Sequence, residues 1–380
     1  MKIGIDASRA NRDQKTGVEW YAFLLIQELK NIIPSDVEVI LYSRRPLAGK
    51  LAELPSNWKE KVLVWPPKFL WTQVRMSWEM IVQAPDVLFI PSHIIPIIHP
   101  KNTVVTMHDV AWKFFPEAYT WKGRTYHQFG AKFGAKYASK IITISQSSAN
   151  DIIKYYPAAK DKINITPLAY DTKNYKIIEN DNLISEAKAK YALTKPYLMS
   201  IGRLETKKNT DKIILAFNEV KKQHDVQLLL VGQPRPGRGY ELIEKLINES
   251  PYKDDIKIPG WAPQDDIPVL MNGAKLFLFP SKYEGFGIPI LEAMACGCPV
   301  ITSNITACPE VAGNAAVLID PNNIDQISRQ LLKLIKDNDF REEIIKRGLE
   351  KVGEFSWEKT ARESWEIIQG KKNNDKNFPL

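Results

Sequence analysis

The 380-residue sequence contains few cysteines and no long apolar run, and each absence excludes a class of protein. Cys296, Cys298 and Cys308 are spaced neither as a zinc ribbon nor as a redox C-x-x-C pair, so we expect small buried side chains. No window approaches the roughly 18 apolar residues that span a bilayer. Met1 leads directly into a strand pattern without a signal-peptide core. We therefore expect a cytoplasmic protein, with peripheral attachment to the inner face of the plasma membrane as an option.

Nucleic-acid-binding modules are also missing, and the basic charge is confined to one half of the chain. Residues 1–170 carry 22 Lys and Arg against 14 Asp and Glu, whereas the remaining residues carry 30 of each. Seven of the ten tryptophans lie in the same basic half. This composition suggests an anionic partner, such as a membrane surface or a phosphorylated acceptor. Incidental basicity with buried tryptophans is the alternative, and a nucleic-acid partner is the poorer explanation.

Apolar runs alternate with helical patterns through most of the chain. In the first half we expect strands at 2–6, 37–42, 87–90, 103–107 and 141–144, with helices at 18–31 and about 121–139. In the second half we expect strands at 197–201, 227–231, 275–279 and 300–302, with helices at 211–223 and from Gly239 and Pro289. This alternation predicts an α/β fold of two Rossmann-like, doubly wound domains.

The predicted domain boundaries follow from this pattern and from the length of the chain. Residues 1–170 form an N-terminal domain, the polar stretch 171–195 a connection, and residues 196–354 a C-terminal domain. A last helix covers 355–370, and the polar tail 371–380 is expected to be disordered. Two such domains enclose a cleft, where small ligands commonly bind.

The strongest motif extends from Pro280 to Ala293 and begins where the strand 275–279 ends. Ligands of open α/β sheets bind at this carboxyl edge. Its glycine-rich centre presents backbone amides beside a helix N-terminus, which favours anionic or hydroxyl oxygens. Glu284 precedes the helix and Glu292 lies about one turn inside it, so the two carboxylates can hold different hydroxyls of one ligand. A structural turn with solvated glutamates is the alternative.

A second motif, from Ser200 to Asn209, also follows a strand and precedes a helix. Arg203 and Lys208 can both reach a diphosphate, the first as a planar fork and the second as a point charge. Lys207 is a less favoured neighbour of Lys208. Read alone, the motif is only a basic loop.

Together the two motifs resemble the retaining GT-B glycosyltransferases of family 4, and the resemblance covers nearly the whole chain. It implies that Glu284, with Phe286 and Gly287, faces the transferred sugar and that Glu292 holds the ribose. Arg203 and Lys208 match the diphosphate clamp of the family. The other implied donor-binding positions are Gly17, Gly202, Gly232, Trp261, Ala262, Gly285 and Ile288.

The first half carries weaker matches to the same family. Gly17 resembles the glycine loop that approaches the donor phosphate, although a glycine at a helix start is common. His108 follows the strand 103–107, where a family histidine touches the donor sugar. Ser145 resembles a family serine, but capping of the next helix is its expected role. The resemblance further implies that the helix 355–370 returns to the first domain.

The resemblance implies catalysis without metal or other cofactor, since Arg203 and Lys208 can neutralise the leaving diphosphate. Asp337 and Asp339 formally match a metal-binding Asp-x-Asp motif, but we expect an ordinary polar turn there. A covalent intermediate on Glu284 is one route to retention. We favour same-face substitution, because Glu284 is expected to bind hydroxyls.

The predicted function is therefore the retaining transfer of a hexosyl group from a nucleotide-diphosphate sugar (EC 2.4.1.-). The overall resemblance to bacterial mannosyltransferases of surface-polysaccharide assembly favours mannose, with GDP-mannose as donor and a glycan or lipid-linked acceptor. The alternatives are a nucleotide-sugar epimerase of the same fold and a non-catalytic protein that binds nucleotide sugars or anionic surfaces.

Taken through Trp121–Lys140, the expected helix carries two stripes of side chains. One stripe is aromatic and comprises Tyr126, Phe129, Phe133 and Tyr137. The other is basic, lies about 100° away, and comprises Lys132, Lys136 and Lys140. An aromatic stripe usually faces the core and a lysine stripe usually faces solvent. The alternative is that the lysines meet anionic lipid headgroups.

Overall fold

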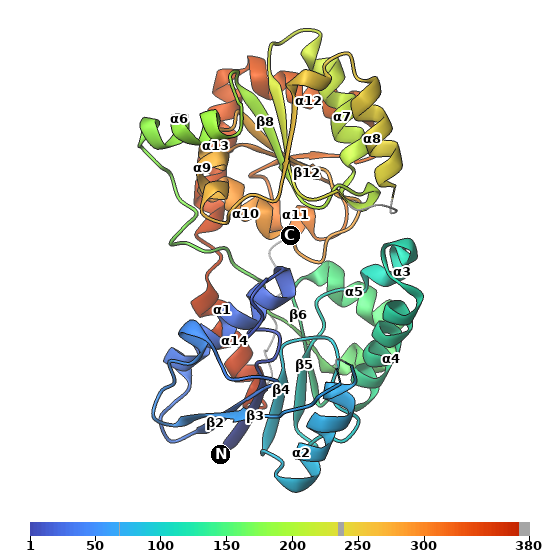
Figure 1. Cartoon of the computed structure of the whole chain (residues 1–380), viewed down its shortest axis with the longest axis vertical. Helices are drawn as coiled ribbons and strands as arrows, with labels where there is room; N and C mark the ends of the chain where they lie inside the picture. Colours follow the sequence, from blue (N-terminus) through green and yellow to red (C-terminus); the bar gives the residue numbers. More distant parts are fainter. Residues whose placement is uncertain (68, 235–238, 372–380) are drawn as a thin grey trace. The chain divides into compact units, whose positions relative to one another are not determined.

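The computed structural model describes residues 1–67, 69–234 and 239–371. Two compact units make up the chain: Met1–Leu168 together with the last helix, and Ala169–Phe355 (Figure 1). Apart from Lys371, the predicted tail lies outside the described residues. Within the described ranges, no helix has the length and hydropathy needed to cross a membrane.

The first unit contains a parallel sheet of seven strands in the order β3-β2-β1-β4-β5-β6-β7. The strands are β1 (Lys2–Asp6), β2 (Glu38–Ser43), β3 (Trp58–Val62), β4 (Val87–Ile90), β5 (Thr103–Thr106), β6 (Lys140–Thr143) and β7 (Ile163–Ile165). The five predicted strands are confirmed to within about a residue, whereas β3 and β7 were not predicted. Both lie at the edges of the sheet.

The helices of this unit follow the strands. They are α1 (Gly17–Ile32), α2 (Ser77–Val82), α3 (Ala111–Phe114), α4 (Trp121–Tyr137), α5 (Gln146–Tyr155) and α14 (Trp357–Ile368). Short turns occur at η1 (Gly49–Leu51), η2 (Trp71–Met76), η3 (Pro116–Ala118) and η4 (Pro157–Lys162). Helix α14 packs against α1 although most of the chain separates them, and the hydroxyl of Thr360 donates a 2.6 Å hydrogen bond to the carbonyl of Pro167.

Helix α4 is oriented differently from the usual arrangement of an aromatic stripe. Its buried residues are the small ones: Gly130, Ala131, Gly134 and Ala135. A side chain at Gly130 would collide with Ile94, 2.6 Å away, so glycine permits the close packing of α4 there. At Gly134 the nearest atom is the terminal methyl group of Met107. Tyr126, Phe129 and Tyr137 are exposed as a consequence. Phe133 packs against the core, so the interpretation of the stripe as a core face is wrong for the other three aromatic residues. The predicted lysine stripe is also shorter than expected, because Lys140 lies in β6 beyond the end of the helix.

The second unit contains a parallel sheet of six strands in the order β10-β9-β8-β11-β12-β13. The strands are β8 (Tyr197–Ile201), β9 (Gln227–Val231), β10 (Ile256–Gly260), β11 (Leu276–Phe279), β12 (Val300–Ser303) and β13 (Val317–Ile319). The helices are α6 (Asp181–Lys190), α7 (Thr210–Lys221), α8 (Tyr240–Glu249), α9 (Asp266–Gly273), α10 (Ile288–Ala295), α11 (Cys308–Ala312), α12 (Ile324–Lys336) and α13 (Asn338–Val352), with short turns η5 (Thr206–Lys208) and η6 (Lys253–Asp255). The two α/β sheets together confirm the predicted fold class.

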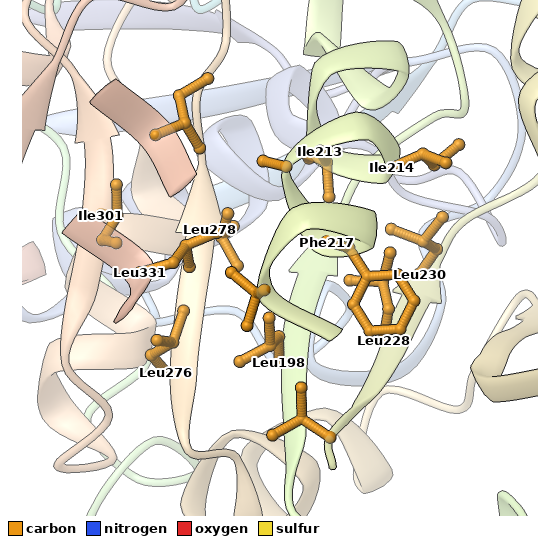
Figure 2. Packing of buried hydrophobic residues seen from close by; sticks show 14 of the residues in the cluster. Leu198, Ile213, Ile214, Phe217, Leu228, Leu230, Leu276, Leu278, Ile301 and Leu331 are labelled. Carbon is orange, nitrogen blue, oxygen red and sulfur yellow. The ribbon is translucent and has the colours of Figure 1, made fainter. Parts of the chain in front are cut away.

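The core of the second unit is aliphatic (Figure 2). Leu198, Leu228 and Leu276 from the strands pack with Phe217 of α7 and Leu331 of α12. Continuous apolar strands of this kind are buried on both faces by the flanking helices. Cys296, Cys298 and Cys308 are buried and free, as the sequence predicted. Within residues 171–195, predicted as a connection, α6 packs against α9 of this unit.

Candidate active site

The motifs of the second unit come together at the carboxyl edge of its sheet. Gly202 follows β8, Gly232 follows β9 and Pro280 follows β11. Because β8 pairs with both β9 and β11, these three loops are neighbours. This edge is where parallel α/β sheets bind their ligands.

Lys208 and Glu284 form an ion pair between the two principal motifs. Lys208 Nζ lies 2.5 Å from Glu284 Oε1, and the side chains are only 22% and 12% exposed. The Glu284 amide donates a 3.2 Å hydrogen bond to Thr306 Oγ1. Burial raises the pKa of Glu284, but the charges of Lys208 and Lys207 and the hydrogen bonds outweigh it, so this pKa lies below its usual value. Glu284 is therefore a carboxylate at neutral pH.

The other basic residues of the second motif are placed differently. Arg203 is exposed. Lys207 Nζ lies 5.7 Å from the ring centroid of Tyr283, whereas Lys208 Nζ lies 5.0 Å from that of Phe279. The ion pair with Glu284 is made by Lys208, whereas Lys207 contacts the same motif through its carbonyl, which accepts a 2.9 Å hydrogen bond from the Lys282 amide.

Glycines allow the loops after β8 and β9 to approach each other. A side-chain carbon at Gly232 would lie 1.7 Å from the carbonyl oxygen of Gly202. The Gly232 amide donates a 2.8 Å hydrogen bond to the carbonyl of Gly260, which joins the end of β10 to the same edge. Trp261, the next residue, is exposed and Ala262 is buried. The glycines therefore have a structural role in shaping this edge.

The glycine-rich loop of the first motif ends at the N-terminus of α10. Gly287 is the N-cap residue with φ 107°, a conformation that favours glycine. Ile288 begins the helix, Pro289 has no amide hydrogen and the Ile290 amide donates a 2.9 Å hydrogen bond to the Gly287 carbonyl, so within this first turn the Ile288 amide is the donor that lacks a helical partner. Phe286 is buried against the ring of Phe355, 5.9 Å away, so only its backbone can serve a ligand. Gly285 precedes it in the loop.

Glu292 lies one turn further along α10 and contacts a residue that the sequence did not single out. The hydroxyl of Tyr175 forms a hydrogen bond with the Glu292 carboxyl group, and Gln264 Nε2 donates a 3.0 Å bond to Tyr175 Oη. Burial raises the pKa of Glu292 to about 7, with a further increase from the charge of Asp171 and a decrease from the Tyr175 bond. The protonation state of Glu292 therefore changes near neutral pH.

In the first unit, the loop between β1 and α1 is fixed by a buried carboxylate. Arg9 and Arg12 each place Nη1 3.1 Å from Glu19 Oε1, and Thr16 caps the helix by bonding Glu19. Burial raises the pKa of Glu19, but the Thr16 bonds and the arginine charges lower it below the usual value. A side-chain carbon at Gly17 would meet no atom within 4 Å. The space beside Gly17 at the start of α1 is therefore open. The sequence did not indicate the charged network that fixes this loop.

His108 follows β5 and lies among other aromatic rings. It is buried, its ring centroid is 4.6 Å from that of Tyr21, and its Nε2 lies 3.4 Å from the carbonyl of Pro91. Two more histidines continue this group, with ring centroids 5.2 Å apart for His93 and His108 and 6.0 Å apart for His93 and His127. Burial lowers the pKa of His108 to about 4, so its imidazole is neutral at pH 7. Sequence spacing identified His108 but not its neighbours.

Two further motif residues act as helix caps. Ser145 Oγ accepts a 3.0 Å hydrogen bond from the Ser148 amide at the start of α5. Asp337 Oδ1 accepts one of the same length from the Phe340 amide at the start of α13. Both bonds satisfy amides that a helix N-terminus leaves without partners. The Asp337–Asp339 turn therefore begins a helix.

Comparison with known proteins places both units in one group of enzymes. Residues 15–174 match the family described as Glycosyltransferase Family 4, and residues 183–351 match Glycosyl transferases group 1. The chain is 32% identical over 259 residues to the O-antigen chain mannosyltransferase B of Escherichia coli, covering 68% of each protein. It is 30% identical over 272 residues to the serotype-specific mannosyltransferase WbdA of Escherichia coli. That match covers 69% of this chain but only 32% of WbdA.

Solved structures show the same fold. The Anabaena protein Alr3699/HepE, in complex with UDP and glucose, superposes with a TM-score of 0.75 and 18% identity, over 97% of this chain and all of that one. WaaG, a glycosyltransferase involved in lipopolysaccharide biosynthesis, superposes with a TM-score of 0.72 and 17% identity over the same shares. The two-domain GT-B architecture is thereby established for this chain.

Proposed function

Since this chain belongs to the family 4 glycosyltransferases, we propose that it transfers a mannosyl group from a nucleotide-diphosphate sugar, preferably GDP-mannose. The acceptor in this proposal is a glycan or a lipid-linked glycan of a surface polysaccharide, and the anomeric configuration is retained. The observation that carries the proposal is the ion pair between Lys208 and Glu284 at the ligand-binding edge of the second unit.

The donor half of the proposal follows from the charges at this edge. A diphosphate needs cations, which Lys208 and the exposed Arg203 supply, and the Ile288 amide at the start of α10 adds a donor. Glu284, held ionised by Lys208, accepts hydrogen bonds from the hydroxyls of the sugar. Glu292 then accepts from the ribose hydroxyls, with Tyr175 holding its carboxyl group.

Catalysis in this proposal rests on stabilising the leaving diphosphate as its charge develops. Lys208 has three donor hydrogens, so it can contact a phosphate oxygen while it retains Glu284. These fixed positive charges supply what a divalent ion would otherwise supply, and we propose a metal-independent reaction. We further propose that the phosphate accepts the proton of the acceptor hydroxyl, because the carboxylate of Glu284 is engaged by Lys208.

The first unit supplies the remaining contacts in the proposal. The open space at Gly17 lets a phosphate approach the N-terminus of α1, where a side chain would stand in its way. A neutral His108 can donate to or accept from a sugar hydroxyl without adding charge. Mannose is favoured because the E. coli relatives are mannosyltransferases, one of them an O-antigen chain enzyme.

The site of action in this proposal is the cytoplasmic face of a membrane. Lys132 and Lys136 of α4, together with Lys140 at the start of β6, would meet anionic headgroups. Helix α4 supports this because its small residues face the protein and leave its larger side chains outside.

The proposal is tested by incubating the purified protein with GDP-mannose, UDP-glucose and GDP-glucose, each with a mannose-terminated oligosaccharide. We expect thermal stabilisation by the donor and release of GDP that depends on the acceptor. A ligand at 100 times its dissociation constant adds about 2.7 kcal/mol of stability, which a melting experiment resolves. Stabilisation without any turnover would instead indicate a nucleotide-sugar-binding protein.

A further inference from the structure

The first unit exposes an unusual group of large apolar side chains around α2. Val64, Phe69, Trp78, Ile81 and Val82 are each between 57% and 69% exposed. Scattered apolar residues are common on protein surfaces, but a contiguous group marks an interaction surface. Five such residues within 19 positions indicate a contact with something other than water.

Two of these side chains, Trp78 and Ile81, line one groove. Its other lining residues are Trp65, Gln73, Val74, Arg75, Ser77 and Ile98. Its wall from the loop after β4 is held in place because the Ile98 amide donates a 3.3 Å hydrogen bond to Ser77 Oγ. Trp65 Nε1 donates a 2.9 Å bond to the carbonyl of Phe69, which ties the loop after β3 to the same surface.

The loop after β4 continues this surface as far as α4. His99 and Phe133 have ring centroids 5.9 Å apart, and Phe133 in turn lies 5.8 Å from Phe129 and 4.7 Å from Tyr137. Phe129 and Tyr137 are both 46% exposed. We call the apolar side chains of α2, of the loop 91–102 and of the aromatic stripe of α4 the apolar surface. It extends over three segments of the first unit.

The backbone is strained where the chain enters the turn η2, which lines part of the groove. Leu70 has φ 59°, in the left-handed region that a leucine rarely adopts, and it precedes the π-helical turn η2. Leu70 is also 46% exposed, so burial of its own side chain does not account for the strain. Strain of this kind persists where the surrounding structure enforces it, often at functional surfaces.

The charge beside the aromatic stripe has one sign. Residues 118–150, which include α4, contain five Lys and Arg and no Asp or Glu. Near α2, Lys61 and Arg75 are compensated, because both pair with the buried Glu79, Arg75 at 3.2 Å. The surface therefore combines apolar side chains at α2 with aromatic side chains and positive charge at α4, which matches the headgroup region of an anionic bilayer.

We infer that the apolar surface inserts into the headgroup region of an anionic phospholipid bilayer, with Trp78 and Ile81 as the inserted side chains. Insertion differs from the purely electrostatic contact of the α4 lysines, because part of the binding then survives high salt. This inference rests on the proposed membrane-borne acceptor for its purpose. Vesicle binding is measured without donor or acceptor, so its result is independent of sugar transfer.

The test uses full-length protein floated with phosphatidylcholine vesicles that contain or lack phosphatidylglycerol. The variants are the double substitution Trp78→Ser/Ile81→Ser and the control Leu242→Ser, which removes an exposed leucine from α8 of the other unit. We expect wild type and control to float with the anionic vesicles. The double variant should bind at least tenfold more weakly at high salt, with an unchanged melting temperature because both side chains are exposed.

Brominated lipids provide a second readout, since they quench tryptophans that enter the acyl boundary. Insertion is supported if brominated lipids quench the tryptophan fluorescence of wild type, and quench that of Trp78→Ser less. Equal binding of wild type and the double variant overturns the inference, as does absence of wild-type binding at low salt. A wild-type dimer that the double variant dissociates also overturns it, because the surface would then be covered by a second copy.

Discussion

Lys208 and Glu284 are 76 positions apart in sequence, and their side chains meet at 2.5 Å. This pair connects the loop after β8 with the loop after β11, two neighbouring strands of one sheet. The aliphatic stem of Lys208 passes over Gly202, where a side-chain carbon would lie 3.4 Å from it. Glu284 and the backbone at Gly202 therefore position the Lys208 ammonium group before any donor arrives. A preorganised charge of this kind stabilises a transition state.

The first prediction concerns the close approach of two loops. Gly232→Ala should destabilise the protein by about 3 kcal/mol or more, because the new carbon would lie 1.7 Å from the Gly202 carbonyl oxygen and the backbone must move. Gly260→Ala is the matched control. It has φ +76° but open space around it, so it should cost only about 1–2 kcal/mol of backbone strain. Urea unfolding measures both, and equal losses would show that the contact is unimportant.

The second prediction concerns the pH dependence of donor binding. The pKa of Glu292 is about 7, so its carboxylate, which accepts the ribose hydroxyls in our proposal, is lost as the pH falls below 7. Donor affinity should therefore increase between pH 6 and pH 8. Glu292→Gln should bind the donor weakly at every pH, without this increase. Isothermal titration of GDP at several pH values checks it, and an unchanged slope in the variant would contradict it.

Stability provides an independent check on the same carboxyl group. Its folded pKa of about 7 exceeds the ordinary 4.5, so between these values the folded state binds more protons than the unfolded state. Its contribution to the free energy of unfolding therefore falls as the pH rises from 4.5 to 7. Glu292→Gln lacks this loss. The difference in melting temperature, variant minus wild type, should therefore be larger at pH 8 than at pH 5. A constant difference would show that Glu292 titrates normally.

The third prediction is that transfer persists in EDTA. Lys208 and Arg203 provide the positive charge at the leaving diphosphate in our proposal. Removal of divalent ions should therefore leave the transfer rate within about twofold of the untreated rate. The measurement compares initial rates after dialysis against EDTA with rates after addition of magnesium or manganese. A complete loss that either ion restores would refute the proposed leaving-group chemistry.

The fourth prediction separates membrane charge from donor binding. Lys132→Glu/Lys136→Glu/Lys140→Glu should weaken binding to anionic vesicles at low salt, since each lysine near the surface contributes about 1 kcal/mol. Thermal stabilisation by the donor should be unchanged in this variant. Binding to neutral vesicles serves as the control. Loss of donor binding along with vesicle binding would indicate a damaged fold instead.

The interior of each sheet could be predicted from the sequence, but the edges could not. Every strand with neighbours on both sides is a recognisable apolar run, because helices bury both of its faces. The four edge strands, β3, β7, β10 and β13, were all missed. In β3 the central residues Lys59 and Glu60 are exposed and charged, which removes the apolar signal. Charged edge strands are common, since they discourage pairing with other chains.

The candidate site divides in a similar way. Glu284, Lys208 and Glu292 could be identified because each lies in a motif beside a strand end or helix start. Tyr175 and Thr306 could not, because they reach the site from 117 and 22 positions away along the chain and no local pattern marks them. The orientation of α4 was equally hidden, since its aromatic and its small residues repeat with the same helical period.

The central claim is tested most directly by the rate of mannosyl transfer from GDP-mannose, with the product analysed by NMR. Wild type should form an α-mannoside from the α-configured donor. Lys208→Ala and Glu284→Gln should each lose on the order of 100–1,000-fold in kcat while melting as wild type does. Lys207→Ala is the matched control and should retain most activity. A β-mannoside product, or a Lys208→Ala enzyme with the wild-type rate, would contradict the account.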